Sequence, residues 1–221
     1  TTHEEPFLVK LKSRKKPKPG QIVEIDRASL EVRKVLGYQD EPGVDLKVVI
    51  NQHNLFEQFA DETLAEAAAL PAEPEPQDFA GRADYRNWTI VTIDGEKAQD
   101  FDDAVSIRKL SNGHYLLGVH IADVSHYVRP GSALDREAYQ RGTSVYFPDL
   151  TLPMLPEKLS NDLCSLRPRV ARLAISALME IDDRGEILQS DFHPSVIQTA
   201  ERMTYNSVFK IFQGDTEERH R

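Results

Sequence analysis

The chain has 221 residues, of which 40% are hydrophobic and 29% are charged, so it can bury a sizeable core in one large or two small domains. Its formal net charge of −9 argues against a protein that binds nucleic acid through charge alone. No apolar run reaches the roughly 18 residues of a transmembrane helix, and the first residues show no signal-peptide pattern, so we expect no membrane partner. The single cysteine, Cys164, excludes an intrachain disulfide and fits a reducing, cytoplasmic location.

The first 52 residues contain a basic stretch followed by short runs typical of strands. Residues 10–18 carry six lysines and arginines and no acid, a composition that suits contacts to phosphates and equally a solvated connection. Strand-like runs follow at 21–25, 29–35 and 45–50, separated by turn residues. These short strands and the basic stretch predict that residues 1–52 form part of a small β-barrel of the oligonucleotide-binding kind.

A helix and a proline-rich linker are predicted next. Residues 52–70 space their apolar side chains as an amphipathic helix does, and Pro71 ends the pattern. The polar segment 72–78 contains two prolines among acidic residues, a composition typical of a linker. We therefore assign residues 53–80 to the helix and linker and residues 81–221 to a second domain.

The second domain is predicted to mix strands and helices, which gives the chain a mixed α/β (α+β) fold. Strand-like runs lie at 88–93, 105–110, 114–128, 143–147, 172–182 and 186–193, and helices are predicted at 132–142 and 204–212. Ser132 with Asp135 resembles a capping box at the start of the first helix, and Gly142 supplies its stop signal. The turn residues 111–113 favour a β-hairpin between two of the strands.

An acidic loop, residues 94–103, lies between two of these strands. It reads D-G-E-K-A-Q-D-F-D-D and contains Glu96 and four aspartates, Asp94, Asp100, Asp102 and Asp103. A solvated acidic turn is the plain alternative, because most acidic runs are solvated. Two features favour a functional loop on a rigid scaffold instead: the flanking sequence is strongly apolar, and Phe101 interrupts the acids as if one side chain were turned inward.

Crowded carboxylates of this kind favour a metal site. Like charges a few Å apart are relieved by a raised pKa or by a bound cation. Oxygen ligands without Cys or His nearby favour Mg²⁺ or Mn²⁺ over Zn²⁺, and two such ions about 4 Å apart stabilise an in-line displacement at phosphate. A calcium loop of the D-x-D-x-D-G type is set aside, because its glycine and its late glutamate are missing.

Several other polar residues have both a structural and a functional interpretation. His120, Asp123 and His126 are predicted to lie on one strand. Both histidines would then face the opposite side of the sheet from Asp123, so the three side chains cannot bind one metal ion. A structural role is therefore favoured for both histidines. Asp123, inside an apolar strand, needs a partner such as an arginine. Cys164 is interpreted as a buried packing residue. Three roles are open for Arg167, Arg169 and Arg172: they could bind phosphates, brace the acidic loop or form structural ion pairs.

Four motifs resemble those of a known enzyme family, the ribonuclease II / ribonuclease R family of exoribonucleases. Its signature is similar, in the same order, to V-T-I-D-G-E-K-A-Q-D-F-D-D-A at 91–104, H-I-A-D-V-S at 120–125, S-V-Y-F-P at 144–148 and L-P-M-L-P-E-K-L-S-N-D-L-C-S-L-R-P at 152–168. The resemblance covers residues 82–202 well and the upstream segment more loosely. Four separated motifs in order are far more specific than one acidic cluster.

The resemblance implies the end of a cold-shock-like RNA-binding barrel followed by the N-terminal part of an RNB catalytic domain. It implies processive hydrolysis of single-stranded RNA from the 3′ end, with release of nucleoside 5′-monophosphates and with Mg²⁺, or alternatively Mn²⁺, as the cofactor. Asp94, Asp100 and Asp103 would hold the metal. Asp102 would be the further catalytic carboxylate. Tyr146 would stack on the 3′-terminal nucleotide and help to set the length of the final product.

The family's catalytic domain is longer than residues 81–221. The sequence is therefore expected to be an incomplete piece whose partners are single-stranded RNA and the C-terminal part of the same enzyme. Two alternatives stay open: a catalytically inactive RNA-binding relative, and a phosphatase or DNA nuclease that shares only the acidic cluster. The presence of all four aspartates favours the enzyme over the inactive relative, and the other motifs favour it over the phosphatase or DNA nuclease.

Overall fold

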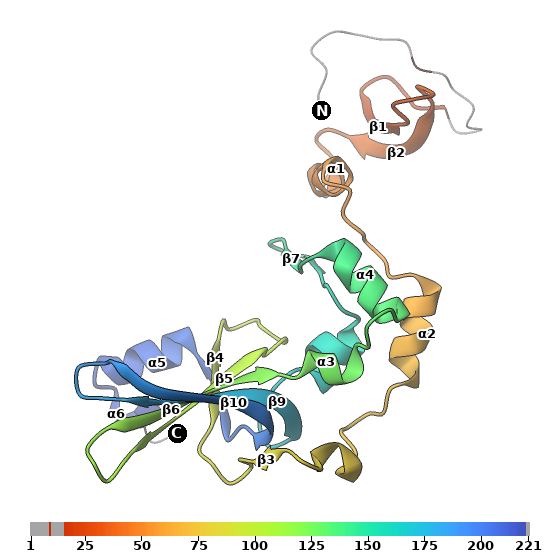
Figure 1. The fold of residues 1–221 in the computed structure, drawn as a ribbon. Coiled ribbons are helices and arrows are strands. Elements are labelled where there is room, and N and C mark those ends of the chain that lie inside the picture. Colours follow the sequence, from red (N-terminus) through yellow and green to blue (C-terminus); the bar gives the residue numbers. More distant parts are fainter. Residues whose placement is uncertain (1–8, 10–15, 220–221) are drawn as a thin grey trace. The chain divides into compact units, whose positions relative to one another are not determined.

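The computed structural model describes residue 9 and residues 16–219. Most of the basic stretch 10–18 therefore lies outside the described residues, and its predicted role stays a prediction. The chain divides between Gln58 and Phe59 into two compact units (Figure 1). In the part of the chain that the structure describes, no helix has both the length and the apolarity needed to cross a bilayer.

The first unit contains a two-stranded antiparallel sheet and a helix. β1 (Gln21–Ile25) pairs with β2 (Val32–Tyr38), and α1 (Val44–Gln52) follows. The first two predicted strands are therefore confirmed, with small shifts of their ends. The predicted strand at 45–50 is wrong, because these residues lie in α1.

A left-handed glycine and a buried contact accompany the helix found at 45–50. A short apolar run does not by itself distinguish a strand from a buried helix. Gly43, in the left-handed conformation with a φ of +80°, turns the chain into α1. Val44 is buried against Gly37 of β2, where an added Cβ would lie 2.6 Å from Val44 Cγ2. The partial barrel stays a prediction, since the described residues of this unit show two strands of it.

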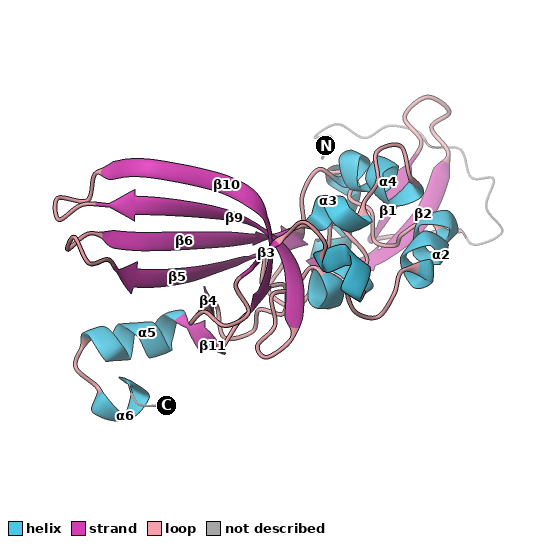
Figure 2. Ribbon diagram, turned by 60° about the horizontal axis from the view of Figure 1, so that its bottom comes forward, coloured by secondary structure: helices cyan, strands magenta, loops and turns pink. Residues whose placement is uncertain are grey.

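A seven-stranded sheet organises the second unit. Its strand order is β11-β4-β5-β6-β9-β10-β3, and its pairs are antiparallel except for β11 with β4 and β10 with β3. The strands are β3 (Ala83–Asp84), β4 (Val91–Asp94), β5 (Asp103–Lys109), β6 (Tyr115–Ala122), β9 (Ala171–Ile181), β10 (Ile187–Gln198) and β11 (Glu201–Thr204). Figure 2 shows β5, β6, β9 and β10 side by side. The sequence patterns therefore predicted the existence of the central strands, but the strand expected at 114–128 ends at Ala122.

Helices and short elements accompany this sheet. They are α2 (Asp61–Ala69), a 3-10 helix (Pro76–Phe79), α3 (Val124–Tyr127), α4 (Ala133–Arg141), the strand pair β7 (Val145–Tyr146) and β8 (Thr151–Leu152), a π-helix (Lys158–Leu163), α5 (Tyr205–Phe212) and α6 (Thr216–Arg219). The capping prediction for α4 is confirmed, because the Asp135 N–H donates to Ser132 Oγ at 3.2 Å and Gly142 ends the helix. The predicted helix at 52–70 is wrong in its first half, since α2 begins only at Asp61.

The mixed α/β class is confirmed by this combination of sheets and helices. The predicted domain boundaries, at 1–52, 53–80 and 81–221, stay a prediction. In the structure, α2 and the proline-rich segment belong to the same compact unit as the large sheet. Lys158 contributes to this arrangement, because its Nζ donates to the carbonyls of Ala68 and Leu70 at the end of α2.

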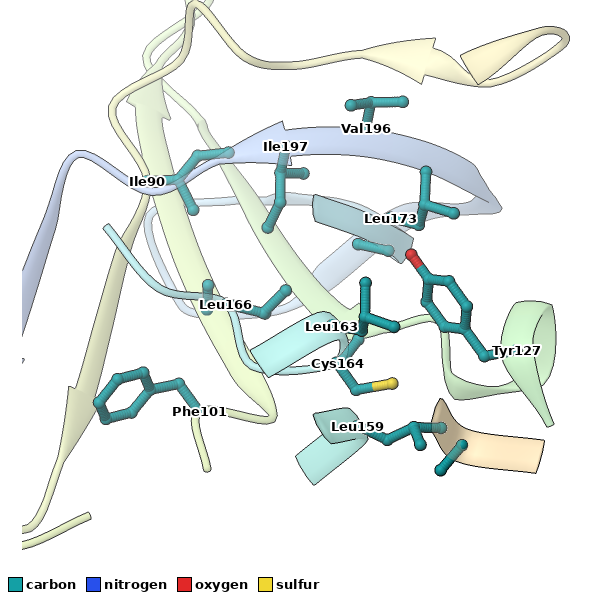
Figure 3. Close-up of a cluster of buried hydrophobic side chains, with 14 of the residues drawn as sticks. Ile90, Phe101, Tyr127, Leu159, Leu163, Cys164, Leu166, Leu173, Val196 and Ile197 are labelled. Atoms are coloured by element: carbon teal, nitrogen blue, oxygen red, sulfur yellow. The ribbon is translucent and has the colours of Figure 1, made fainter. Parts of the chain in front are cut away.

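The core of the second unit forms where the segment around the π-helix packs on the sheet. Figure 3 shows large side chains from both parts in one buried cluster: Leu159, Leu163, Leu166, Leu173, Val196 and Ile197. Cys164 is buried among them, which confirms its interpretation as a packing residue. Burial raises the pKa of its thiol to about 12. Phe101 of the acidic loop belongs to the same cluster, so the loop is anchored in the core.

Candidate active site

The acidic loop joins two neighbouring strands of the large sheet. Asp94 is the last residue of β4 and Asp103 is the first residue of β5, and the two strands pair antiparallel through Val91 and Val105. The other two aspartates lie in the connection between them. The scaffold is therefore the one predicted, a loop whose ends are both fixed in a sheet.

Asp94 is half-buried at the end of β4. Burial raises the pKa of its carboxyl and the charges of Asp103 and Asp100 raise it further, while Thr92 and Arg202 act to lower it. The Oδ2 atom of Asp94 is buried and has no hydrogen-bond partner in the structure. A buried acceptor without a donor costs free energy, and a cation at this oxygen would remove that cost.

The pKa of Asp102 is raised as well. Desolvation by the surrounding protein is the main cause, although the side chain still reaches solvent, and the charges of Asp100, Asp103 and Asp94 add to it. We call the four aspartates the coupled acidic group, because the charges of Asp100 and Asp103 act on both Asp94 and Asp102. This is the crowding that the sequence predicted.

Phe101 fixes the loop to the core from the middle of the acidic run. Its side chain is buried, as the interrupted pattern predicted. Its N–H donates to Ser165 Oγ at 3.1 Å, and its carbonyl accepts from the Leu166 N–H at 2.8 Å. The carbonyl of Asp102 accepts from the Ala122 N–H at 2.9 Å. Hydrogen bonds therefore hold the backbone at Phe101 and Asp102, next to the coupled carboxylates.

Tyr146 reaches the acidic loop from a hairpin 46 residues further along the chain. It lies in β7, it is 63% exposed, and its hydroxyl donates a hydrogen bond to Asp100 Oδ2. The bond to Asp100, together with burial, raises the pKa of Tyr146 to about 12, so the hydroxyl keeps its proton at neutral pH. An exposed aromatic ring therefore lies beside the acidic group.

The two histidines have structural partners. His120 is fully buried, and its ring nitrogens lie 3.1 Å from Ser106 Oγ and 2.7 Å from Ser176 Oγ. Burial lowers the pKa of His120 to about 4, so the ring is neutral. The prediction that His126 shares its strand is wrong, because the chain leaves β6 after Ala122 and His126 lies in α3, where it pairs with Asp78 at 3.3 Å.

The partners of Asp123 and of the arginines are also structural. Asp123 was expected to need a partner such as an arginine, and that partner is Arg82, 2.6 Å away. Arg172 is fully buried and lies 3.0 Å from Asp162, which also pairs with Arg167 at 2.5 Å. Structural pairing therefore accounts for two of the three arginines. The third, Arg169, is exposed and lies 3.8 Å from Glu201.

Two residues that contact the acidic loop have no signal in the sequence. Arg202 of β11 donates to the carbonyls of Gly95 and Glu96, and Asn206 of α5 donates from Nδ2 to Glu96 Oε1 at 3.0 Å. They lie more than 100 positions after the loop, so no local pattern connects them with it. Glu96 is exposed, and Asn206 holds its side chain.

The donor chemistry of the acidic group fits a hard divalent cation. All four side chains offer carboxylate oxygens, which Mg²⁺ and Mn²⁺ prefer. The orphaned Oδ2 of Asp94 and the raised pKa of Asp102 are what a bound cation would relieve. Among the residues that the structure describes, no three His, Cys, Asp or Glu side chains already converge on a common metal position.

Comparison with known proteins gives a consistent set of relatives. Residues 82–221 match the family model described as the RNB domain. Ribonuclease R of Thermotoga maritima is 53% identical over 201 residues, which cover 90% of this chain and 28% of that protein. Ribonuclease R of Escherichia coli is 43% identical over 185 residues, which cover 84% of this chain and 23% of that protein.

Solved structures share the fold. Mycoplasma genitalium RNase R in complex with ribose-methylated single-stranded RNA matches with a TM-score of 0.82 and 29% identity, over 94% of this chain and 34% of that chain. The structure of yeast Ssd1, a pseudonuclease, shares the fold with a TM-score of 0.70 and 20% identity, over 83% of this chain and 24% of that chain. This chain spans about a quarter of the length of the curated relatives that it matches. Because the RNB domain covers most of it and its curated relatives are ribonuclease R proteins, the chain belongs to the ribonuclease II / ribonuclease R family.

Proposed function

We propose that the chain carries the acidic part of the catalytic centre of an exoribonuclease. The reaction is processive hydrolysis of single-stranded RNA from the 3′ end, with release of nucleoside 5′-monophosphates and with a requirement for Mg²⁺ or Mn²⁺. The observation that supports this proposal is the coupled acidic group together with Tyr146, an exposed aromatic residue whose hydroxyl donates a hydrogen bond to Asp100. Carboxylates serve phosphodiester hydrolysis by holding metal ions, and an aromatic ring stacks on any base.

The four aspartates have separate proposed roles. Asp94, Asp100 and Asp103 hold the metal, which when bound polarises the phosphate and stabilises the charge that develops on it. Asp102 is the catalytic carboxylate: it orients the attacking water and takes up its proton as the new P–O bond forms and the bond to the leaving 3′ oxygen breaks. The raised pKa of Asp102 supports this role, because a base works best when its pKa lies near the working pH.

The proposed setting is a longer cytoplasmic enzyme that acts on RNA. Mycoplasma genitalium RNase R has been solved in complex with single-stranded and with double-stranded RNA. We extend RNA binding to this chain and take single-stranded RNA as its substrate. The C-terminal part of the same enzyme is the proposed protein partner, and the first unit is proposed to be the end of a cold-shock-like barrel. A catalytically inactive relative is less favoured, because all four aspartates are present.

The direct test uses single-stranded RNA that carries a label at its 5′ end. The chain is assayed alone and as a chimera that replaces the 201 matched residues of Thermotoga maritima ribonuclease R. With Mg²⁺ we expect the labelled RNA to be converted to a short 5′-labelled end product without accumulation of intermediates. Chromatography of the same reaction should detect nucleoside 5′-monophosphates, and a chelator should stop the reaction. Single-stranded DNA and small phosphoesters should remain intact. A folded chimera that is inactive on RNA while the parent enzyme is active would contradict the proposal, and cleavage of DNA or phosphoesters would favour the alternative enzymes.

Removal of the Tyr146 ring is expected to weaken RNA binding. Stacking of a base on an aromatic ring contributes about 1–3 kcal/mol, so Tyr146→Ala should raise the Kd for single-stranded RNA by roughly 5- to 150-fold. Tyr146→Phe keeps the ring and should bind within about twofold of the unaltered chain. The measurement is fluorescence anisotropy of a labelled RNA in the presence of chelator at fixed salt. Tyr139→Ala is the matched control, because Tyr139 is 88% exposed on α4; an equal loss in both alanine variants would argue against a stacking role.

A further inference from the structure

Arg202 lies one strand away from the start of the acidic loop. It belongs to β11, the neighbour of β4 in the sheet (Figure 2). The two strands are parallel, and their register places Arg202 opposite Thr92, two residues before Asp94. Its Nη2 donates to the carbonyl of Gly95 at 2.5 Å and to that of Glu96 at 2.9 Å. These are the first two residues after Asp94, so one guanidinium nitrogen fixes the first turn of the loop.

The same guanidinium also contacts the second half of the loop. Its central carbon lies 5.3 Å from the centroid of the Phe101 ring, within the range of a cation–π contact. Phe101 stands between Asp100 and Asp102 in the sequence. Arg202 therefore connects the turn that follows Asp94 with the core residue that lies between Asp100 and Asp102.

A second residue of the same segment contacts the same turn. Asn206, the second residue of α5, donates from Nδ2 to the Glu96 carboxylate at 3.0 Å. Residues of one short segment, 202–206, therefore fix both the backbone and the side chain of the turn at 95–96.

We propose that Arg202 is a positioning residue, which holds the acidic loop in the shape that lets its aspartates bind one divalent metal site. This inference rests on the proposed function, because it assumes that the loop binds metal. Arg202 acts through the loop and does not need to touch RNA. Residues that orient metal ligands from outside the ligand set typically contribute 10- to 100-fold to metal affinity, so its removal should be visible in metal binding alone.

The test measures Mn²⁺ binding to the whole chain without RNA, from the electron paramagnetic resonance signal of free Mn²⁺. Arg202→Met keeps the apolar stem but removes the donors and the charge, and it should weaken Mn²⁺ binding by about 10- to 100-fold. Arg202→Lys keeps the charge but cannot reach both carbonyls and the ring together, so it should also bind more weakly than the unaltered chain. Arg184→Met removes an exposed arginine from the turn between β9 and β10 and should change nothing.

Two companion measurements separate this role from general damage to the fold. The unfolding temperature of Arg202→Lys and its RNA affinity in chelator should stay close to those of the unaltered chain. Mn²⁺ affinity that is unchanged in both Arg202 variants overturns the inference, and so does a loss of RNA affinity in chelator without a loss of Mn²⁺ binding. If the unaltered chain binds Mn²⁺ and Asp94→Asn abolishes this, such a result leaves the proposed function standing. If the unaltered chain binds no Mn²⁺, the metal site of the proposed function fails together with this inference.

Discussion

The variant Asp102→Asn is expected to release mononucleotides from single-stranded RNA about 10²- to 10⁴-fold more slowly than the unaltered protein, the contribution of a positioned acid or base. Asparagine has the shape of aspartate but cannot take up a proton from water. The carbonyl of Asp102 is held by the Ala122 N–H at 2.9 Å, so the backbone should stay in place when the side chain changes. The loss should therefore appear in kcat.

RNA affinity distinguishes a catalytic role from a structural one. Loss of one negative charge near the proposed RNA path should leave the Kd for RNA unchanged or lower it, since phosphates are repelled by carboxylates. The assay compares single-turnover rates and Kd values of the chimera described above, with and without the substitution. Asp183→Asn, in the exposed turn between β9 and β10, is the control and should keep full activity. Equal rates for Asp102→Asn and the unaltered chimera would remove Asp102 from the catalytic centre.

Local signals predicted much of the site and its scaffold. The acidic loop lies between two strands, and Phe101 is buried in the core, as its interruption of the acidic run predicted. The capped start of α4 and the turn at 111–113 also formed where expected. These features depend on residues within a few positions of one another, and that is the range over which sequence periodicity and capping act.

Two kinds of feature were not predicted from the sequence. The strand expected at 45–50 is a helix, because a short apolar run does not distinguish the two structures and the left-handed Gly43 turns the chain into α1. The other features depend on long-range contacts. The proximity of Tyr146 to Asp100, and of Arg202 to Gly95, depends on how strands distant in sequence are ordered in space. The motifs identified Tyr146 only through a family resemblance, and they gave no reason to single out Arg202.

The largest stability effect is expected from the buried ion pair between Arg82 and Asp123. The side chains are 11% and 5% exposed, and Nη2 lies 2.6 Å from Oδ2. Arg82 also donates from Nε to the Asp78 carbonyl at 3.0 Å and from Nη1 to the carbonyls of Ala174 and Ser195 at 3.4 and 3.5 Å. One side chain therefore connects the segment before β3, the end of β6 and the two longest strands.

Arg82→Met should lower the free energy of unfolding by about 3–5 kcal/mol, because it leaves a buried carboxylate without its partner. Urea denaturation followed by tryptophan fluorescence measures this effect in the second unit, since Trp88 is the single tryptophan of the chain. Arg86→Met is the matched control. Arg86 pairs with Asp84 at 2.6 Å in an exposed position, where an ion pair contributes about 0–1 kcal/mol. Similar losses in both variants would mean that burial does not strengthen the Arg82 pair.

The same pair predicts how stability changes with pH. Burial acts to raise the pKa of Asp123, but hydrogen bonds from Ser125 and Arg82 and the charge of Arg82 outweigh it, so the pKa lies below its ordinary value. Such a carboxyl stabilises the fold above its unfolded pKa of about 3.9 and loses this effect as the pH falls through its folded pKa. The difference in unfolding free energy between the unaltered chain and Asp123→Asn should therefore be largest near neutral pH and shrink below about pH 4. A difference that stays constant on acidification would show that the geometry of Asp123, and not its charge, holds Arg82 in place.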